Sequence, residues 1–207
     1  MWNRIVLLAA AVAASFAVTG AGQVASPATV EDPAAAHAVR VLTGSDSAAG
    51  PAPAAVLAAA IPADFAAVSG YRPVAVTDAD GSARLVDPSG GCSWLGSTTY
   101  DFGPACRSHD LGYDLLRYAT AKGGTLGPWA RHAVDDRFGA DLRERCAAVS
   151  GGAGCAGLAH VTAGAVGFNS WRQGYGSPGD EAVWPYLVSG VLIAAALAAP
   201  SVVRRFR

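Results

Sequence analysis

The sequence predicts a mainly α-helical domain that is stapled by disulfides, contains one short β-hairpin and is followed by a C-terminal transmembrane helix. Three observations support this prediction. The residues after Pro104 form three stretches with helical signals, all four cysteines lie in the central part of the chain, and an uncharged apolar run lies near each end of the chain. Two or three helices locked by short disulfides are enough for a small core.

The N-terminal apolar run, residues 5–18, follows Arg4 and precedes small residues. This order is typical of a secretory signal peptide, here residues 1–22, with cleavage near Ala21. An uncleaved membrane anchor is the alternative, but the run is shorter than the ~20 residues that a span usually needs. Residues 23–62 are rich in Ala, Pro, Gly and Ser without a sustained apolar period. They are interpreted as a low-complexity linker with a solvated His37, in which short helices around 54–60 remain possible.

The predicted domain covers residues 63–178, with ordered structure beginning near Phe65. Two β-prone runs, 74–77 and 83–86, flank a turn-rich segment and indicate a small hairpin. The turn has two aspartates and a glycine but no downstream glutamate, so a solvated turn is preferred over a calcium loop. Helices are expected at 104–119, 128–149 and 156–172, because Pro104 suits a first helical turn and glycines end the first stretch.

The C-terminal run, residues 182–203, is uncharged and is followed by three arginines in residues 204–207. It is long enough to cross a bilayer, Trp184 and Tyr186 suit the interface, and the arginines would stay in the cytoplasm. We therefore expect a transmembrane helix with a basic cytoplasmic tail, and a domain held on the extracellular side of the cell membrane. A buried C-terminal helix is the alternative.

Charge and cysteine content narrow the class further. A net charge of −1, from 15 Lys and Arg against 16 Asp and Glu, offers no basic surface and argues against nucleic acid as a partner. Four cysteines behind an export signal imply two disulfides, for which three pairings are possible. We expect neighbours to pair, Cys92 with Cys106 and Cys146 with Cys155, because this closes two short loops.

The candidate centre is the pair His109 and Asp110. Adjacent helical residues point about 100° apart, so the imidazole and the carboxylate go to different partners. Asp135, on the next helix, can fix the tautomer of His109 so that the other ring nitrogen takes a proton from water. Asp136 is the alternative partner. Asp110 can turn toward the loop at residues 90–91 and help to bind a hard cation, which would stabilise an oxyanion.

The run Cys-Arg-Ser-His-Asp-Leu-Gly-Tyr at residues 106–113, with Asp135 and the later cysteines, resembles the bacterial and fungal branch of the secreted phospholipase A2 family. The resemblance covers roughly residues 88–171. It implies hydrolysis of the sn-2 acyl ester of membrane glycerophospholipids, releasing a fatty acid and a lysophospholipid. It also implies the two disulfides expected above.

The resemblance assigns roles to individual residues. His109 would be the general base and Asp135 its supporting carboxylate, while Asp110 and the backbone carbonyl of Gly91 would bind calcium. The remaining two are supporting residues: Gly112 would allow close helix packing, and Tyr113 would stabilise the site through its hydroxyl group.

One position departs from the family pattern. Gly90 stands where the family usually has an aspartate, and calcium sites weaken as ligand charge is removed. Either Asp87 or Asp101 supplies the carboxylate, or calcium binds weakly or not at all. The alternative function is therefore a catalytically weak or inactive phospholipase-like module that serves binding or structure at the membrane surface.

The remaining histidines and aromatic residues are assigned more ordinary positions. His132 is expected at the surface and His160 at an interior or boundary position. A zinc site formed by these two and His109 would lack a closely spaced ligand pair. The chain has no Gly-x-Ser-x-Gly motif, which disfavours a serine esterase. Trp94, Leu95 and Trp129 are candidates either for an apolar rim around lipid chains or for the core.

Overall fold

The computed structural model describes residues 30–45, 52–78, 80–92, 100–179, 188, 190 and 191. The chain divides into two compact units, Pro27–Pro178 and a second unit made of Met1–Ser26 and Gly179–Arg207. The fold below is that of the first unit. The predicted signal peptide and basic tail lie outside the described residues, as does almost all of the predicted span at 182–203. Among the residues that are described, no helix has the length and apolar character needed to cross a membrane.

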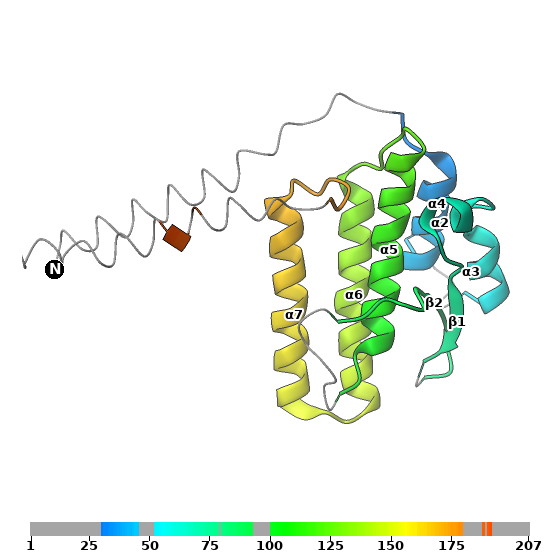
Figure 1. Cartoon of the computed structure of the whole chain (residues 1–207). Helices are drawn as coiled ribbons and strands as arrows, with labels where there is room; N and C mark the ends of the chain where they lie inside the picture. Colours follow the sequence, from blue (N-terminus) through cyan, green and yellow to red (C-terminus); the bar gives the residue numbers. More distant parts are fainter. Residues whose placement is uncertain are drawn as a thin grey trace, which may run out of the picture. The chain divides into compact units, whose positions relative to one another are not determined.

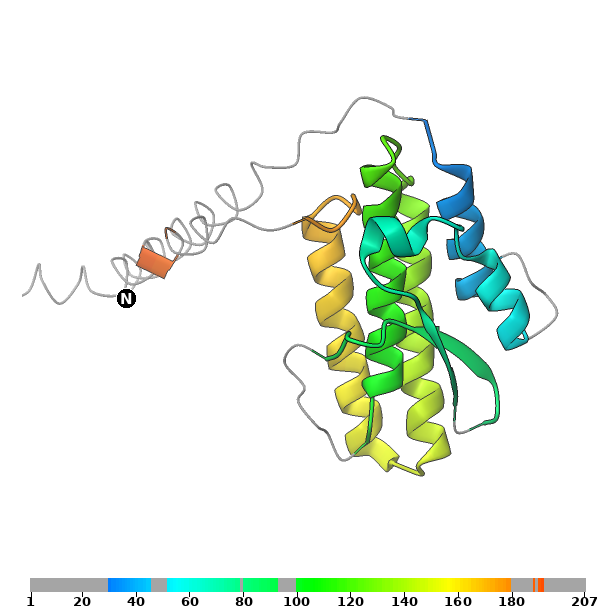
Figure 2. The ribbon, with the colours of Figure 1, turned by 45° about the vertical axis from the view of Figure 1, so that its right-hand side comes forward.

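Three long helices form the body of the unit. These are α5 (Gly103–Ala121), α6 (Pro128–Ala148) and α7 (Gly152–Arg172), which run up, down and up beside one another (Figures 1 and 2). A proline lies in the first turn of both α5 and α6, where its missing N–H costs no hydrogen bond. The prediction of a mainly helical domain is confirmed, although α7 begins earlier than the expected residue 156.

Three shorter helices precede the hairpin: α2 (Pro33–Thr43), α3 (Ala54–Ala60) and α4 (Phe65–Ser69). The interpretation of residues 23–62 as a linker is therefore wrong for α2, whereas α3 matches the short helix that was left possible at 54–60, and order begins well before Phe65. Helix α2 packs against α5 and α6, and its Ala35, Ala38 and Val39 are fully buried. The Asp32 carboxylate accepts a hydrogen bond from the Ala35 N–H and caps α2. Alanine suits both a helix and a tight interface, so the composition that indicated a linker instead forms core.

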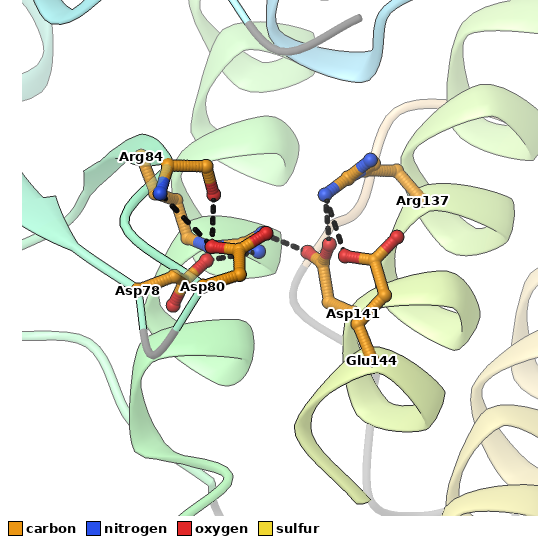
Figure 3. A network of polar contacts seen from close by, with 7 residues as sticks. Asp78, Asp80, Arg84, Arg137, Asp141 and Glu144 are labelled. Atoms are coloured by element: carbon orange, nitrogen blue, oxygen red, sulfur yellow. Dashed lines mark hydrogen bonds and ion pairs between the residues drawn. The ribbon is translucent and has the colours of Figure 1, made fainter. Parts of the chain in front are cut away.

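Strands β1 (Val74–Thr77) and β2 (Ala83–Val86) form the predicted antiparallel hairpin, with Val74 opposite Val86. A polar network joins this hairpin to α6 (Figure 3). Arg84 on β2 forms ion pairs with Asp78 beside the turn and with Asp141 on α6. Arg137 pairs with Asp141 and Glu144 from the other side. The Asp141 side chain is only 2% exposed, so the network fixes the hairpin against the helices through a buried charge.

Two disulfides complete the unit, with the expected pairing. Cys92–Cys106 ties the loop after β2 to the first turns of α5, and Cys146–Cys155 joins the end of α6 to the start of α7. Disulfides persist in oxidising compartments, so the pairing indicates an oxidising environment such as the outside of a cell. The first disulfide also holds the Gly90–Gly91 loop near the beginning of the helix that bears His109.

Candidate active site

The central feature of the site is a hydrogen bond between the two predicted partners, His109 on α5 and Asp135 on α6. Nε2 of His109 lies 3.0 Å from Oδ1 of Asp135, and each side chain is 9% exposed. Among the described residues, no hydrogen bond reaches Nδ1 of the imidazole. A carboxylate at Nε2 favours the tautomer with its proton on that nitrogen, which leaves the Nδ1 lone pair free to accept a proton.

Aromatic rings hold the imidazole in place. The ring centroid of His109 lies 4.2 Å from that of Tyr113, one helical turn later on α5, and 4.7 Å from that of Phe138 on α6. Phe138 is 3% exposed and belongs to the core. Rotation of the imidazole away from Asp135 would therefore require the core to repack.

The hydroxyl group of Tyr113 contacts the dyad. Its hydroxyl group donates a hydrogen bond to Oδ1 of Asp135 at 2.9 Å and lies 3.0 Å from the hydroxyl group of Ser170 on α7. Burial raises the pKa of Tyr113, and the charge of Asp135 raises it further, so the phenol keeps its proton. Asp135 therefore accepts hydrogen bonds from two side chains through a single oxygen atom.

Asp110 faces the loop at Gly90 and Gly91, as predicted. Its Oδ2 accepts a hydrogen bond of 2.8 Å from the backbone N–H of Gly91. Gly90 lies against two carboxylates, those of Asp110 and Asp87. A Cβ atom on Gly90 would lie 2.6 Å from Oδ2 of Asp110 and 3.2 Å from Oδ2 of Asp87. A side chain at position 90 would collide with Asp110, so this close approach requires glycine.

Of the two carboxylates considered as substitutes for that aspartate, only Asp87 is near. Asp87 is 8% exposed and follows β2, and its other oxygen accepts hydrogen bonds from Ser89. Asp101 instead pairs with Arg145 at 3.2 Å, on the side of the α6 C-terminus. Asp87 and Asp110 thus bring two carboxylates to one glycine, a set of hard oxygen donors of the kind that calcium prefers.

The proximity of these acids has an electrostatic effect. Burial raises the pKa of the Asp110 carboxyl, while the hydrogen bond from the Gly91 N–H acts in the opposite direction. Asp114 and Asp87 add smaller contributions that raise it. A cation placed here would relieve both the burial and the repulsion.

A small pocket that opens to solvent lies beside His109 between α2, α5 and α6. Its apolar lining residues are Val39, Leu42, Gly112, Leu115, Val134 and Phe138. Its other lining residues, besides His109, are polar and come from three helices: Thr43, Ser108, Arg137 and Asp141. Helix α2, which composition did not predict, thus forms one wall of the space next to the imidazole.

Other predicted residues fall outside this site. His132 is exposed, as expected, and its ring stacks on that of Tyr175. His160 is also exposed, so its predicted interior or boundary position is wrong. Trp129 packs against the core beside α2, and its N–H donates to Glu31. Trp94 and Leu95 lie outside the described residues. Within the described part of the chain, no three histidine, cysteine or acidic side chains lie close enough together to hold a metal ion. The three histidines considered for zinc therefore form no such group.

Two residues of the site were missed by the sequence reasoning. Ser170 on α7 and Arg131 on α6 both contact the Tyr113 hydroxyl group. Arg131 precedes Asp135 by one helical turn, and this spacing alone places the two on one face of α6. Ser170 has no comparable signal, because only the packing of α7 brings it to the site.

The comparisons with known proteins add no relative: no family model, curated protein or solved structure matches this chain.

Proposed function

We propose that this chain is a phospholipase A2-type hydrolase that cleaves the sn-2 acyl ester of glycerophospholipids with His109 as its general base. The observation that supports the proposal is the bond between Nε2 of His109 and Asp135, because it leaves Nδ1 to take a proton from water. The sn-2 position and the lipid class come from the family resemblance described above.

The chemistry needs one water molecule and the dyad. As Nδ1 accepts the proton, the water oxygen bonds to the ester carbonyl carbon, and Asp135 stabilises the imidazolium that forms. The C–O bond to the glycerol then breaks, and the imidazolium returns the proton to the departing alkoxide. The products are a fatty acid and a lysophospholipid. The small open pocket beside His109 would give water access to the imidazole.

Calcium is the proposed cofactor, since the donors near Gly90 are hard oxygen atoms. Asp110 and the Gly91 carbonyl would hold it, with Asp87 as the second carboxylate, and it would supply positive charge for the ester oxygen. The membrane is both the source of the substrate and, through residues 182–203, the proposed anchor. The site would then act at the extracellular face of the cell's own membrane.

A catalytically weak or inactive binding module is the second candidate. Gly90 supplies no carboxylate, and the Gly91 N–H already occupies an oxygen of Asp110 that a cation would use. The intact bond between His109 and Asp135 favours the enzyme, since a module that only binds has no need for it.

The test is fatty-acid release by the purified full chain from vesicles of phosphatidylcholine and phosphatidylglycerol, with millimolar calcium or with chelator. We expect release that requires calcium and is lost in His109→Ala. His160→Ala, an exposed histidine on α7, is the matched control and should behave as the wild type. No release from the wild type, or undiminished release from His109→Ala, would contradict the proposal.

A further inference from the structure

A buried arginine lies behind the dyad. Arg131 is 1% exposed, and its Nε lies 2.9 Å from Oγ of Ser170 and 3.3 Å from the hydroxyl oxygen of Tyr113. Its Nη1 donates to the backbone carbonyl of Gly176 at 2.9 Å. Within the described residues, no carboxylate lies at ion-pair distance from the guanidinium. A positive charge is therefore buried without a direct negative partner.

Such a charge is costly to bury unless it is compensated. Asp135, one turn along α6, belongs to the same hydrogen-bond network. Tyr113 bridges Arg131 and Asp135 with one contact to each. Among the described residues, one buried atom of each member has no hydrogen-bond partner: Nη2 of Arg131 and Oδ2 of Asp135. The arginine and the aspartate thus form a separated ion pair that is connected through a phenol.

The chemistry of the two ends sets the direction of the hydrogen bonds between them. A guanidinium only donates and a carboxylate only accepts. Since Nε–H of Arg131 donates to Ser170, the serine hydroxyl hydrogen is available for Tyr113, and the Tyr113 hydrogen is left for Asp135. The same direction ends at His109, whose Nε2–H donates to the same oxygen of Asp135. The hydroxyl groups of Ser170 and Tyr113 therefore each have a single orientation that satisfies this series of hydrogen bonds.

We propose that Arg131 is a positioning residue for the His109–Asp135 dyad. It sets, through Ser170 and Tyr113, the direction of the hydrogen bonds that keep Asp135 aimed at Nε2 of His109. The kinetic consequence rests on the proposed hydrolysis. The orientation of the hydrogen bonds is independent of that hydrolysis, and it can be measured even if the protein has no activity.

The experiment uses proton NMR of the full chain in chelator, observing the Nε2 proton of His109 and the hydroxyl proton of Tyr113. The two signals are assigned by their loss in His109→Ala and Tyr113→Phe. Both protons are hydrogen-bonded to a carboxylate, so we expect signals that exchange slowly with water in the wild type. In Arg131→Met both signals should broaden or disappear, whereas Arg131→Lys, which keeps the charge, should restore them in part. Arg143→Met, an exposed arginine on the same helix, is the matched control and should leave both signals unchanged.

Two further measurements keep the inference open to refutation. Ser170→Ala removes one link without removing a charge, so it tests the chain of hydrogen bonds even if Arg131→Met does not fold, and it should speed exchange of the Tyr113 proton. In the lipid assay, Arg131→Met should lower kcat by about 10- to 100-fold, the usual effect of removing a partner behind a functional side chain, with little change in KM. Unchanged proton signals in folded Arg131→Met, or in Ser170→Ala, would overturn the role of Arg131. If the wild type releases no fatty acid, the proposed function fails, while the NMR comparison still decides this inference.

Discussion

Nε2 of His109 and Oδ1 of Asp135 lie 3.0 Å apart although 26 residues separate them in the chain. The distance depends on how closely α5 approaches α6, because each residue lies on a different helix. Gly112 permits that approach: a Cβ atom there would lie 2.6 Å from Cγ1 of Val134, the residue before Asp135. The dyad is therefore a product of helix packing and not of a flexible loop, which suits a site that must hold its geometry.

The Asp135→Asn variant tests whether the carboxylate is needed. An amide keeps the shape but can present its NH2 group to Nε2, which favours the wrong tautomer and cannot stabilise an imidazolium. We expect kcat for fatty-acid release to fall by about 10²- to 10⁴-fold, the range that general-base catalysis supplies. Asp136→Asn, its exposed neighbour, should keep wild-type activity. Equal losses of kcat in the two variants would contradict a specific role of Asp135 as the partner of His109.

The His109–Asp135 dyad could be predicted because both residues lie in or near short sequence patterns that mark their helices. The run at residues 106–113 marks the helix with His109, and the next helix offers Asp135 and Asp136 as partners. The structure brings Asp135 to the imidazole and leaves Asp136 exposed. The Cys92–Cys106 disulfide follows from loop length in the same way. What these patterns left undecided was the calcium loop, because the approach of Asp87 to Gly90 depends on how β2 meets α5.

The Asp110 carboxyl should make stability depend on pH. Burial raises its pKa, so the folded state binds the proton more tightly than the unfolded state does. The stability from this group is complete below the unfolded pKa of about 3.9 and is lost as pH rises through the folded value. In chelator, Asp110→Asn should therefore raise Tm relative to wild type at pH 7 and lose that advantage at pH 3.

Calorimetry with and without calcium completes the Asp110 experiment. Ligands that bind only the folded state raise Tm, so calcium should stabilise the wild type and not Asp110→Asn. A lower Tm for Asp110→Asn at both pH values would show that the hydrogen bond from Gly91 matters more than the burial of the charge. An equal calcium effect on both proteins would exclude Asp110 as a ligand.

Features that depend on contacts between residues far apart in the chain could not be predicted from the sequence. Composition marked residues 23–62 as a linker, since alanine runs have little apolar periodicity, yet Ala35 and Ala38 are fully buried because α5 and α6 provide a matching surface. Arg84 and Arg131 belong to no motif in the sequence. Their partners, Asp141 and Ser170, lie 57 and 39 residues away, and nothing near either arginine in the chain indicates burial.

The buried pair of Arg84 and Asp141 should be important for stability. Arg84→Met leaves the Asp141 charge with Arg137 as its remaining partner, and breaking a buried pair in this way costs about 3 kcal/mol. Because an apolar pair avoids the buried charge, Arg84→Met combined with Asp141→Leu should recover part of that loss. Urea unfolding measures both changes. Asp80→Asn, in the exposed hairpin turn, is the control, and a loss of similar size there would contradict the importance of burial.

The spacing of α5 and α6 can be tested at Gly112. In Gly112→Ala the new methyl group would meet both methyl groups of Val134, at 2.6 and 2.9 Å. We expect a loss of about 1–3 kcal/mol from overpacking, and a fall in kcat as the shifted helices separate His109 from Asp135. Val134→Ala makes room, so the double variant should regain kcat even though the lost valine methyl groups keep its stability below wild type.

Gly167→Ala is the matched glycine control for this experiment. Gly167 lies on α7, and a methyl group added there would meet no heavy atom within 4 Å, so alanine should raise stability by about 0.5–1 kcal/mol through helix propensity alone. Lipid assays and urea unfolding on the same preparations separate the two effects. If the Gly112→Ala and Val134→Ala double variant recovers no activity, the distance between the helices does not set the dyad, and the hydrogen bonds of Tyr113 and Arg131 would then be what holds Asp135 against the imidazole.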